Sequence, residues 1–182
     1  MRVITGTAKG RRLDTLEGMD VRPTADRVKE GMFSSIQFEL ENSLVLDLFG
    51  GSGQLGIEAL SRGARAAVFV DNSKKSIEII KSNLRKTGFE EKSLVFNMNS
   101  EDFLKITDKK FDFVFLDPPY NKGIIEKTIP LLSGKINKNG KILCEHEKKL
   151  ILPDEINEFR LKKNYKYGKI EVTLYSADRK DD

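Results

Sequence analysis

The sequence predicts an α/β fold: a mostly parallel seven-stranded sheet with helices on both faces, a C-terminal antiparallel hairpin and a short N-terminal extension. Three observations predict it. Apolar runs of strand length alternate with amphipathic helical stretches; the strand cores are continuously apolar, as in strands covered on both faces; and 182 residues correspond to one domain. The single cysteine, Cys144, excludes a disulfide framework and a cysteine-based zinc site.

The first 41 residues are expected to form the extension and one helix. Gly6, Gly10 and Gly18 separate short apolar pieces, which indicates irregular or short-strand structure up to residue 22. Apolar side chains then recur every four residues from Val28 to Leu40, and Thr24 is a good N-cap, so a helix is predicted over 24–41.

Residues 42–182 are expected to form the core of the same domain. The pattern predicts strands at 44–49, 66–70, 94–97, 111–116 and 141–145, and helices at 53–62, 73–86, 100–105 and 123–132. The tail predicts two further strands, 159–165 and 169–176, joined by a turn at Gly168. No apolar run approaches the roughly 18 residues of a membrane span, and the N-terminus has no hydrophobic leader, so we expect a soluble, cytoplasmic protein.

Two strand ends predict a cofactor site. In a doubly wound sheet, ligands bind beyond the carboxyl ends of the strands. Gly51, Gly53 and Gly56 follow the first strand and satisfy G-x-G-x-x-G, which alone also fits a tight turn without a ligand. Asp71 ends the second strand, where a carboxylate can accept both hydroxyls of a ribose or simply favour a helix N-terminus. Together they predict a ribose-bearing cofactor of undefined type.

A third strand end indicates the chemistry. Asp117-Pro118-Pro119-Tyr120 follows the apolar strand 111–116. The exocyclic amine of a nucleobase is a poor nucleophile, and two acceptors, the Asp117 carboxylate and the Pro118 carbonyl, would orient its hydrogens. Prolines supply no competing N–H, and the ring of Tyr120 offers a face for stacking a flipped base.

Taken together, the glycine loop, Asp71 and the D-P-P-Y motif resemble those of S-adenosylmethionine-dependent amino-methyltransferases with a class I, Rossmann-like fold. The resemblance extends over nearly the whole chain to the RsmD family, and R-P-T-x-D-R-V is its most specific motif. It rests on residues 2–6, 9–13, 22–30, 45–53, 58–64 and 167–169.

The resemblance implies methylation of the N2 amine of one guanine in 16S ribosomal RNA, within an assembling or assembled small ribosomal subunit, by a monomeric enzyme without a metal. Asp117, Pro118 and Tyr120 would be catalytic. The S-adenosylmethionine site would consist of Asp47, Gly50, Gly51, Gly53, Asp71, Asn72, Asn99 and Ser100.

The chain departs from the family at three places in this site. Gly50 stands where alanine is usual, and Asn99 stands where many members carry an acid for the adenine amine, with Glu101 and Asp102 as nearby alternatives. Asp71-Asn72 replaces a more usual glutamate-containing run. The other candidates, His146 and Cys144, are expected to be structural.

The charge distribution predicts an RNA-binding extension. The net charge is +4, yet five of the ten arginines fall in the first 27 residues. Arginine fits phosphate groups and guanine edges, although a solvated basic edge would look similar. The residues expected at the RNA are Arg2, Lys9, Arg11, Arg12, Arg22, Thr24 and Arg27.

Three alternatives stay open. An amino-methyltransferase acting on DNA or another RNA would carry the same D-P-P-Y motif. A nicotinamide-dependent oxidoreductase would explain the glycine loop but neither that motif nor the basic extension. A catalytically inactive RNA-binding module would not need the intact motifs.

Overall fold

Eight strands form one mixed sheet in the order β3-β2-β1-β4-β5-β8-β7-β6. The computed structural model describes residues 1–16, 23–119 and 123–177. The five strands from β3 to β5 are parallel, and β8, β7 and β6 continue the sheet in antiparallel pairs. The strands are β1 (Leu44–Asp47), β2 (Ala66–Asp71), β3 (Ser93–Asn97), β4 (Phe111–Leu116), β5 (Ile136–Glu147), β6 (Glu155–Ile156), β7 (Phe159–Tyr167) and β8 (Ile170–Ala177).

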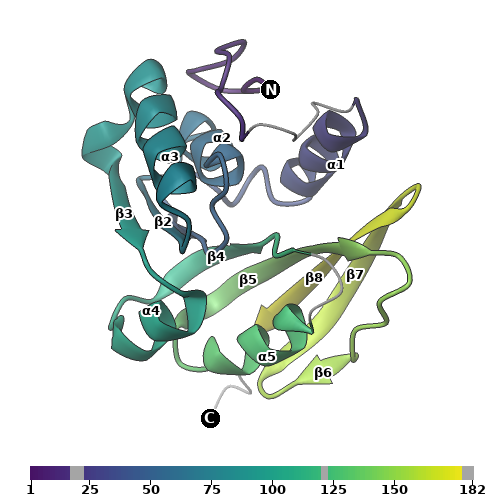
Figure 1. Cartoon of the computed structure of the whole chain (residues 1–182). Coiled ribbons are helices and arrows are strands. Elements are labelled where there is room, and N and C mark those ends of the chain that lie inside the picture. The colour runs from purple at the N-terminus through teal and green to yellow at the C-terminus, as the bar shows by residue number, and fades with distance from the viewer. Residues whose placement is uncertain (17–22, 120–122, 178–182) are drawn as a thin grey trace.

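Helices cover both faces of the sheet, which confirms the predicted fold class. Figure 1 shows α1, α2 and α3 above the sheet and α4 and α5 below it. Phe33 and Ile57 are buried in the upper layer, and Phe103 and Ile129 in the lower one. The helices are α1 (Pro23–Ser34), α2 (Gln54–Ser61), α3 (Lys74–Thr87), the 3-10 helix η1 (Glu90–Lys92), α4 (Ser100–Ile106) and α5 (Ile124–Leu131).

Two predicted boundaries and the predicted number of strands were wrong. The helix predicted over 24–41 ends at Ser34, because the Ser35 hydroxyl bonds the Met32 carbonyl and the chain tightens into turns that still bury Ile36 and Leu40. The fifth strand starts at Ile136 rather than 141, since a register shift lets that residue pair with Phe111. The sheet has eight strands rather than seven because the two-residue β6 pairs with the start of β7.

The N-terminal extension packs onto α2 through one buried carboxylate. Glu58 is fully buried, and its carboxylate accepts the backbone N–H groups of Ile4 and Thr5 at 2.8 and 3.0 Å. The side chains of Lys29 and Arg62 form ion pairs with it at 3.6 and 2.9 Å. The charge is therefore balanced by two cations, and the extension is attached to the same body as the core.

The strand order reverses between β1 and β4. The chain passes from β1 to β2 and β3 on one side of the sheet, and β4 returns on the other side of β1. Loops that leave the carboxyl ends of these two strands diverge, which opens a crevice where ligands bind in doubly wound sheets.

Candidate active site

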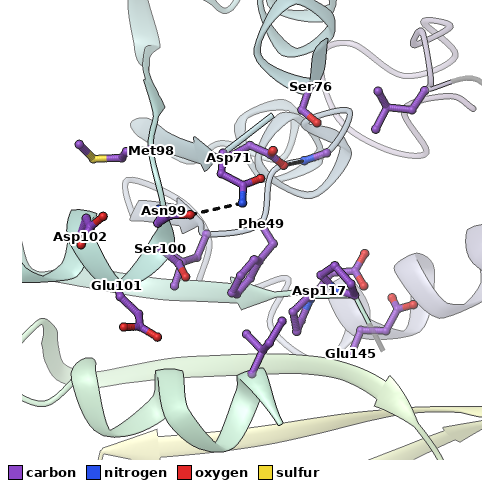
Figure 2. Close-up of a pocket in the computed structure, with 17 residues that line it drawn as sticks. Phe49, Asp71, Ser76, Met98, Asn99, Ser100, Glu101, Asp102, Asp117 and Glu145 are labelled. Carbon is purple, nitrogen blue, oxygen red and sulfur yellow. Dashed lines mark hydrogen bonds between the residues drawn. The ribbon is translucent and has the colours of Figure 1, made fainter. Parts of the chain in front are cut away.

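A cavity of about 890 Å³ occupies this crevice (Figure 2). The segments that follow β1, β2, β3 and β4 all contribute to its wall, together with the end of β5. From the predicted site, the structure brings together Gly51, Asp71, Asn72, Asn99, Ser100, Asp117 and Pro118.

The loop after β1 turns sharply because two of its glycines have positive φ. Gly51 has φ 55° and lines the cavity, while Gly53 has φ 77° and stands at the start of α2. The Gly50 N–H donates to the Val70 carbonyl at 3.0 Å, which ties the loop to β2. Gly50 and Gly53 therefore shape the turn and do not line the cavity.

Asp71 is held in place by the backbone on both sides. One carboxylate oxygen accepts the Gly51 N–H at 2.9 Å and the other accepts the Ser73 N–H at 2.8 Å. The side chain is half-buried in the cavity wall. Since each oxygen can accept a further hydrogen bond, the carboxylate can also accept hydrogen bonds from two neighbouring hydroxyl groups, such as those of a ribose.

Asp47 lies beneath the glycine loop, outside the cavity lining. Its side chain is 2% exposed and accepts the Gly56 N–H at 2.9 Å. Burial raises the pKa of Asp47 to about 7, and the nearby charge of Asp71 adds to the shift. Asp47 therefore does not line the cavity, although the family resemblance implied that it contacts the cofactor.

Asn72 and Asn99 join two strand ends. The Asn72 amide donates to the Asn99 side-chain oxygen at 3.3 Å (Figure 2). Asn99 is the residue before α4, and Ser100, Glu101 and Asp102 beside it line the same wall. The oxygen of Asn99 retains one lone pair for a further donor.

Asp117 and Pro118 follow β4 and face the same cavity as Asp71. Burial raises the pKa of the Asp117 carboxyl well above its usual range, and the carboxylates of Glu145 and Asp47 act in the same direction. Tyr120 lies outside the described residues.

Seven lining residues were not predicted from the sequence. They are Leu16, Leu48, Phe49, Ser76, Met98, Ile124 and Glu145. Six of them contribute apolar surface or a hydroxyl, which carry no distinctive signal in a sequence. Glu145 did carry one, because it stands near the carboxyl end of the predicted fifth strand, where this fold binds ligands.

The predicted RNA-binding side chains are mostly exposed. Arg2, Lys9, Arg12 and Arg27 are exposed, and Arg2 and Arg12 lie side by side in a β-bridge. Arg11 is also exposed, but it donates to the Lys86 carbonyl at 3.1 Å near the end of α3. Arg22 and the side chain of Thr24 lie outside the described residues.

His146 and Cys144 are buried in β5. The His146 ring nitrogens lie 2.9 Å from the Glu147 carbonyl and 2.8 Å from the Thr173 hydroxyl. Burial raises the pKa of the Cys144 thiol. Neither side chain lines the cavity.

The described residues contain neither a cluster of potential metal ligands nor a helix that could span a membrane. Across 1–16, 23–119 and 123–177, no group of three or more His, Cys, Asp or Glu side chains is placed to hold a metal ion. Of the helices in this part of the chain, none combines the length and apolar character needed to cross a bilayer.

Comparison with known proteins gives a consistent result. The family model described as "Conserved hypothetical protein 95" matches residues 1–176. The chain is 38% identical to Ribosomal RNA small subunit methyltransferase D of Haemophilus influenzae, over 96% of this chain and 93% of that protein. The structure of the yhhF protein from Escherichia coli matches with a TM-score of 0.88 at 32% identity, covering 99% of both chains.

S-adenosylmethionine is the cofactor. SMU.776, solved in complex with SAH, shares the fold at a TM-score of 0.71 and 14% identity, over 86% of this chain and 50% of that chain. The residues of this site fit the cofactor: Asp71 is fixed for a ribose, and Gly51 is open, since an added Cβ would meet only the Phe49 carbonyl at 3.9 Å. The nicotinamide alternative is wrong, because the relatives that match most of this chain are named as methyltransferases and not as oxidoreductases. The chain belongs to the RsmD family of S-adenosylmethionine-dependent methyltransferases.

Proposed function

We propose that this protein transfers a methyl group from S-adenosylmethionine to the exocyclic N2 amine of a guanine in 16S ribosomal RNA, within an assembling or assembled small ribosomal subunit. The observation that carries the proposal is that Asp117 and Pro118 line the same cavity as Asp71. The ribosomal RNA substrate is supported by the name of the Haemophilus influenzae relative.

The two acceptors after β4 align the amine. Asp117 accepts one amine hydrogen through its carboxylate, and Pro118 accepts the other through its carbonyl oxygen. This draws the nitrogen lone pair out of conjugation with the ring and aims it into the cavity. Tyr120, beyond the described residues, would stack on the base, which is worth about 1–3 kcal/mol. Holding the reactants in this geometry is worth roughly 7–11 kcal/mol.

Asp117 also suits the proton transfer. S-adenosylmethionine supplies an electrophilic methyl group bound to a sulfonium sulfur. When the methyl group is transferred, the sulfur becomes that of a neutral thioether. The methylated nitrogen then has one proton too many, and it passes this proton to Asp117 or to water. Because burial raises the pKa of Asp117, its carboxylate is a better proton acceptor than an exposed aspartate.

The exposed bases of the extension would bind the RNA backbone. Each phosphate contact releases condensed counterions, so binding should weaken steeply with salt. Lys9, Arg12 and Arg27 are the best candidates, because Arg11 already has a partner in α3.

The test is methylation of small-subunit particles purified from cells that lack the enzyme, with labelled S-adenosylmethionine and mapping of the modified base. We expect label on the N2 amine of one guanine in 16S RNA. Label only in DNA or in another RNA would refute the substrate and favour an amino-methyltransferase of different target.

Two variants separate the roles of the site residues. Asp117→Ala should abolish transfer yet keep S-adenosylhomocysteine binding, since this side chain faces the base. Asp71→Ala should weaken that binding. Calorimetric titration measures both, and loss of cofactor affinity in Asp117→Ala would assign this residue to the cofactor.

A further inference from the structure

Glu145 stands beside Asp117 in the wall of the cavity. The strands β4 and β5 are parallel, and Leu116 pairs with Cys144. The residues that follow this pair are Asp117, just beyond the end of β4, and Glu145, within β5, and both line the cavity. Figure 2 shows the two side chains on the same side of it.

Two neighbouring carboxylates in a partly dehydrated wall repel each other when both are ionised. The charges of Glu145, on β5, and of Asp47, on β1, both act on Asp117. A ligand that presents two adjacent N–H donors would relieve this repulsion, because each carboxylate then gains a hydrogen bond that favours its charged form.

Among the bases with an exocyclic amine, guanine alone offers two adjacent donors. Its N1–H lies next to the N2 amine on the Watson–Crick edge. Adenine places the N1 acceptor beside its amine, and cytosine places the N3 acceptor there. A second carboxylate beside the amine site thus favours guanine and disfavours both other bases, whose ring acceptor would face a carboxylate.

We propose that the Glu145 carboxylate accepts the N1–H of the target guanine while Asp117 accepts an N2–H, which makes Glu145 a determinant of base specificity. This inference rests on the proposed function and deepens it. No bond is made or broken at Glu145; it selects the base and aligns its edge.

The test compares guanine with 2,6-diaminopurine, which keeps the N2 amine but has an acceptor at N1. Each base is placed at the target position of ligated 16S RNA, reconstituted into particles. The wild type should prefer guanine in kcat/KM. In Glu145→Gln the amide can donate to N1 of diaminopurine, so the preference should fall by about ten- to a hundredfold. Glu147→Gln, on the same strand but outside the cavity lining, is the matched control and should keep the wild-type preference.

The outcomes are distinguishable. An unchanged guanine preference in Glu145→Gln, with normal binding of S-adenosylhomocysteine, overturns the role of Glu145. No methylation of guanine particles by the wild type overturns the proposed function itself. If Glu145→Gln fails to fold, Glu145→Asp decides: drawing the carboxylate back should lower kcat/KM on guanine and spare diaminopurine, and an equal loss on both overturns the inference.

Discussion

Asp47 should make the protein less stable as the pH rises. We consider Asp47→Asn, because asparagine keeps an oxygen that can accept the Gly56 N–H while removing the titrating group. Asp47 is 2% exposed, and burial is the main reason why its pKa rises from 3.8 to about 7. The variant therefore isolates the cost of ionising one buried carboxyl.

The magnitude follows from the shift. A rise of about three pH units at 1.36 kcal/mol per unit corresponds to roughly 4 kcal/mol. In the unfolded chain Asp47 loses its proton near pH 4, whereas in the folded protein it does so near pH 7. Between these values the folded state binds more protons, so the free energy of unfolding falls as the pH rises, and the loss is complete above pH 7.

Urea denaturation of wild type and Asp47→Asn between pH 4.5 and 8.5 measures this effect. The two proteins should be similar in stability near pH 4.5, and the variant should be more stable by up to roughly 4 kcal/mol at pH 8.5. Asp108→Asn, at an exposed position, provides the control for loss of a charge. A difference between variant and wild type that is the same at both ends of the range would refute the reasoning.

Three further predictions concern the N-terminal extension and Asp117. Gly6→Ala should lower the free energy of unfolding by about 3 kcal/mol or more, because its Cβ would lie 1.7 Å from a backbone oxygen. Gly10→Ala, which has a similar φ but open space around it, should lower it by only about 1–2 kcal/mol. Thermal melting measures both. Replacing Lys9 and Arg12 with alanine should flatten the salt slope of RNA binding by roughly one to two units without changing the melting temperature; an unchanged slope would remove them from the interface. The acid limb of kcat/KM should have its midpoint well above pH 4, since Asp117 must be ionised to accept the amine, and a midpoint near 4 would contradict its burial.

The local pattern of the chain was enough to predict most of the fold. The helix α3 starts with a Ser73 side-chain cap and ends at Gly88 with φ 76°, as its sequence indicates. The end of α1 was not predictable, because Ile36 and Leu40 keep helical spacing and stay buried in tight turns. Periodicity reports which residues are buried, and several backbone paths can bury the same residues.

Site residues could be predicted where the local sequence marks the end of a strand. They could not be predicted where contacts between distant parts of the chain set the position of a side chain. Asp71 ends an apolar strand just before the Ser73 helix cap, and Asp117 ends another just before two prolines, so their positions at strand ends could be predicted from the sequence. Asp47 also ends a strand, yet its carboxylate lies in the interior and accepts the Gly56 N–H of α2. Glu58 looked like an ordinary helix residue, because its partners Ile4 and Lys29 lie far from it in the sequence.

The attachment of the extension to Glu58 sets an order of events during synthesis. The backbone of Ile4 and Thr5 leaves the ribosome first, but its acceptor lies 53–54 residues further along the chain. At about 5–20 residues per second, the basic segment waits several seconds for α2 to emerge. The first residues made thus reach these contacts only after Glu58 has been synthesised, so the nascent extension stays open to proteases and to polyanions during that interval.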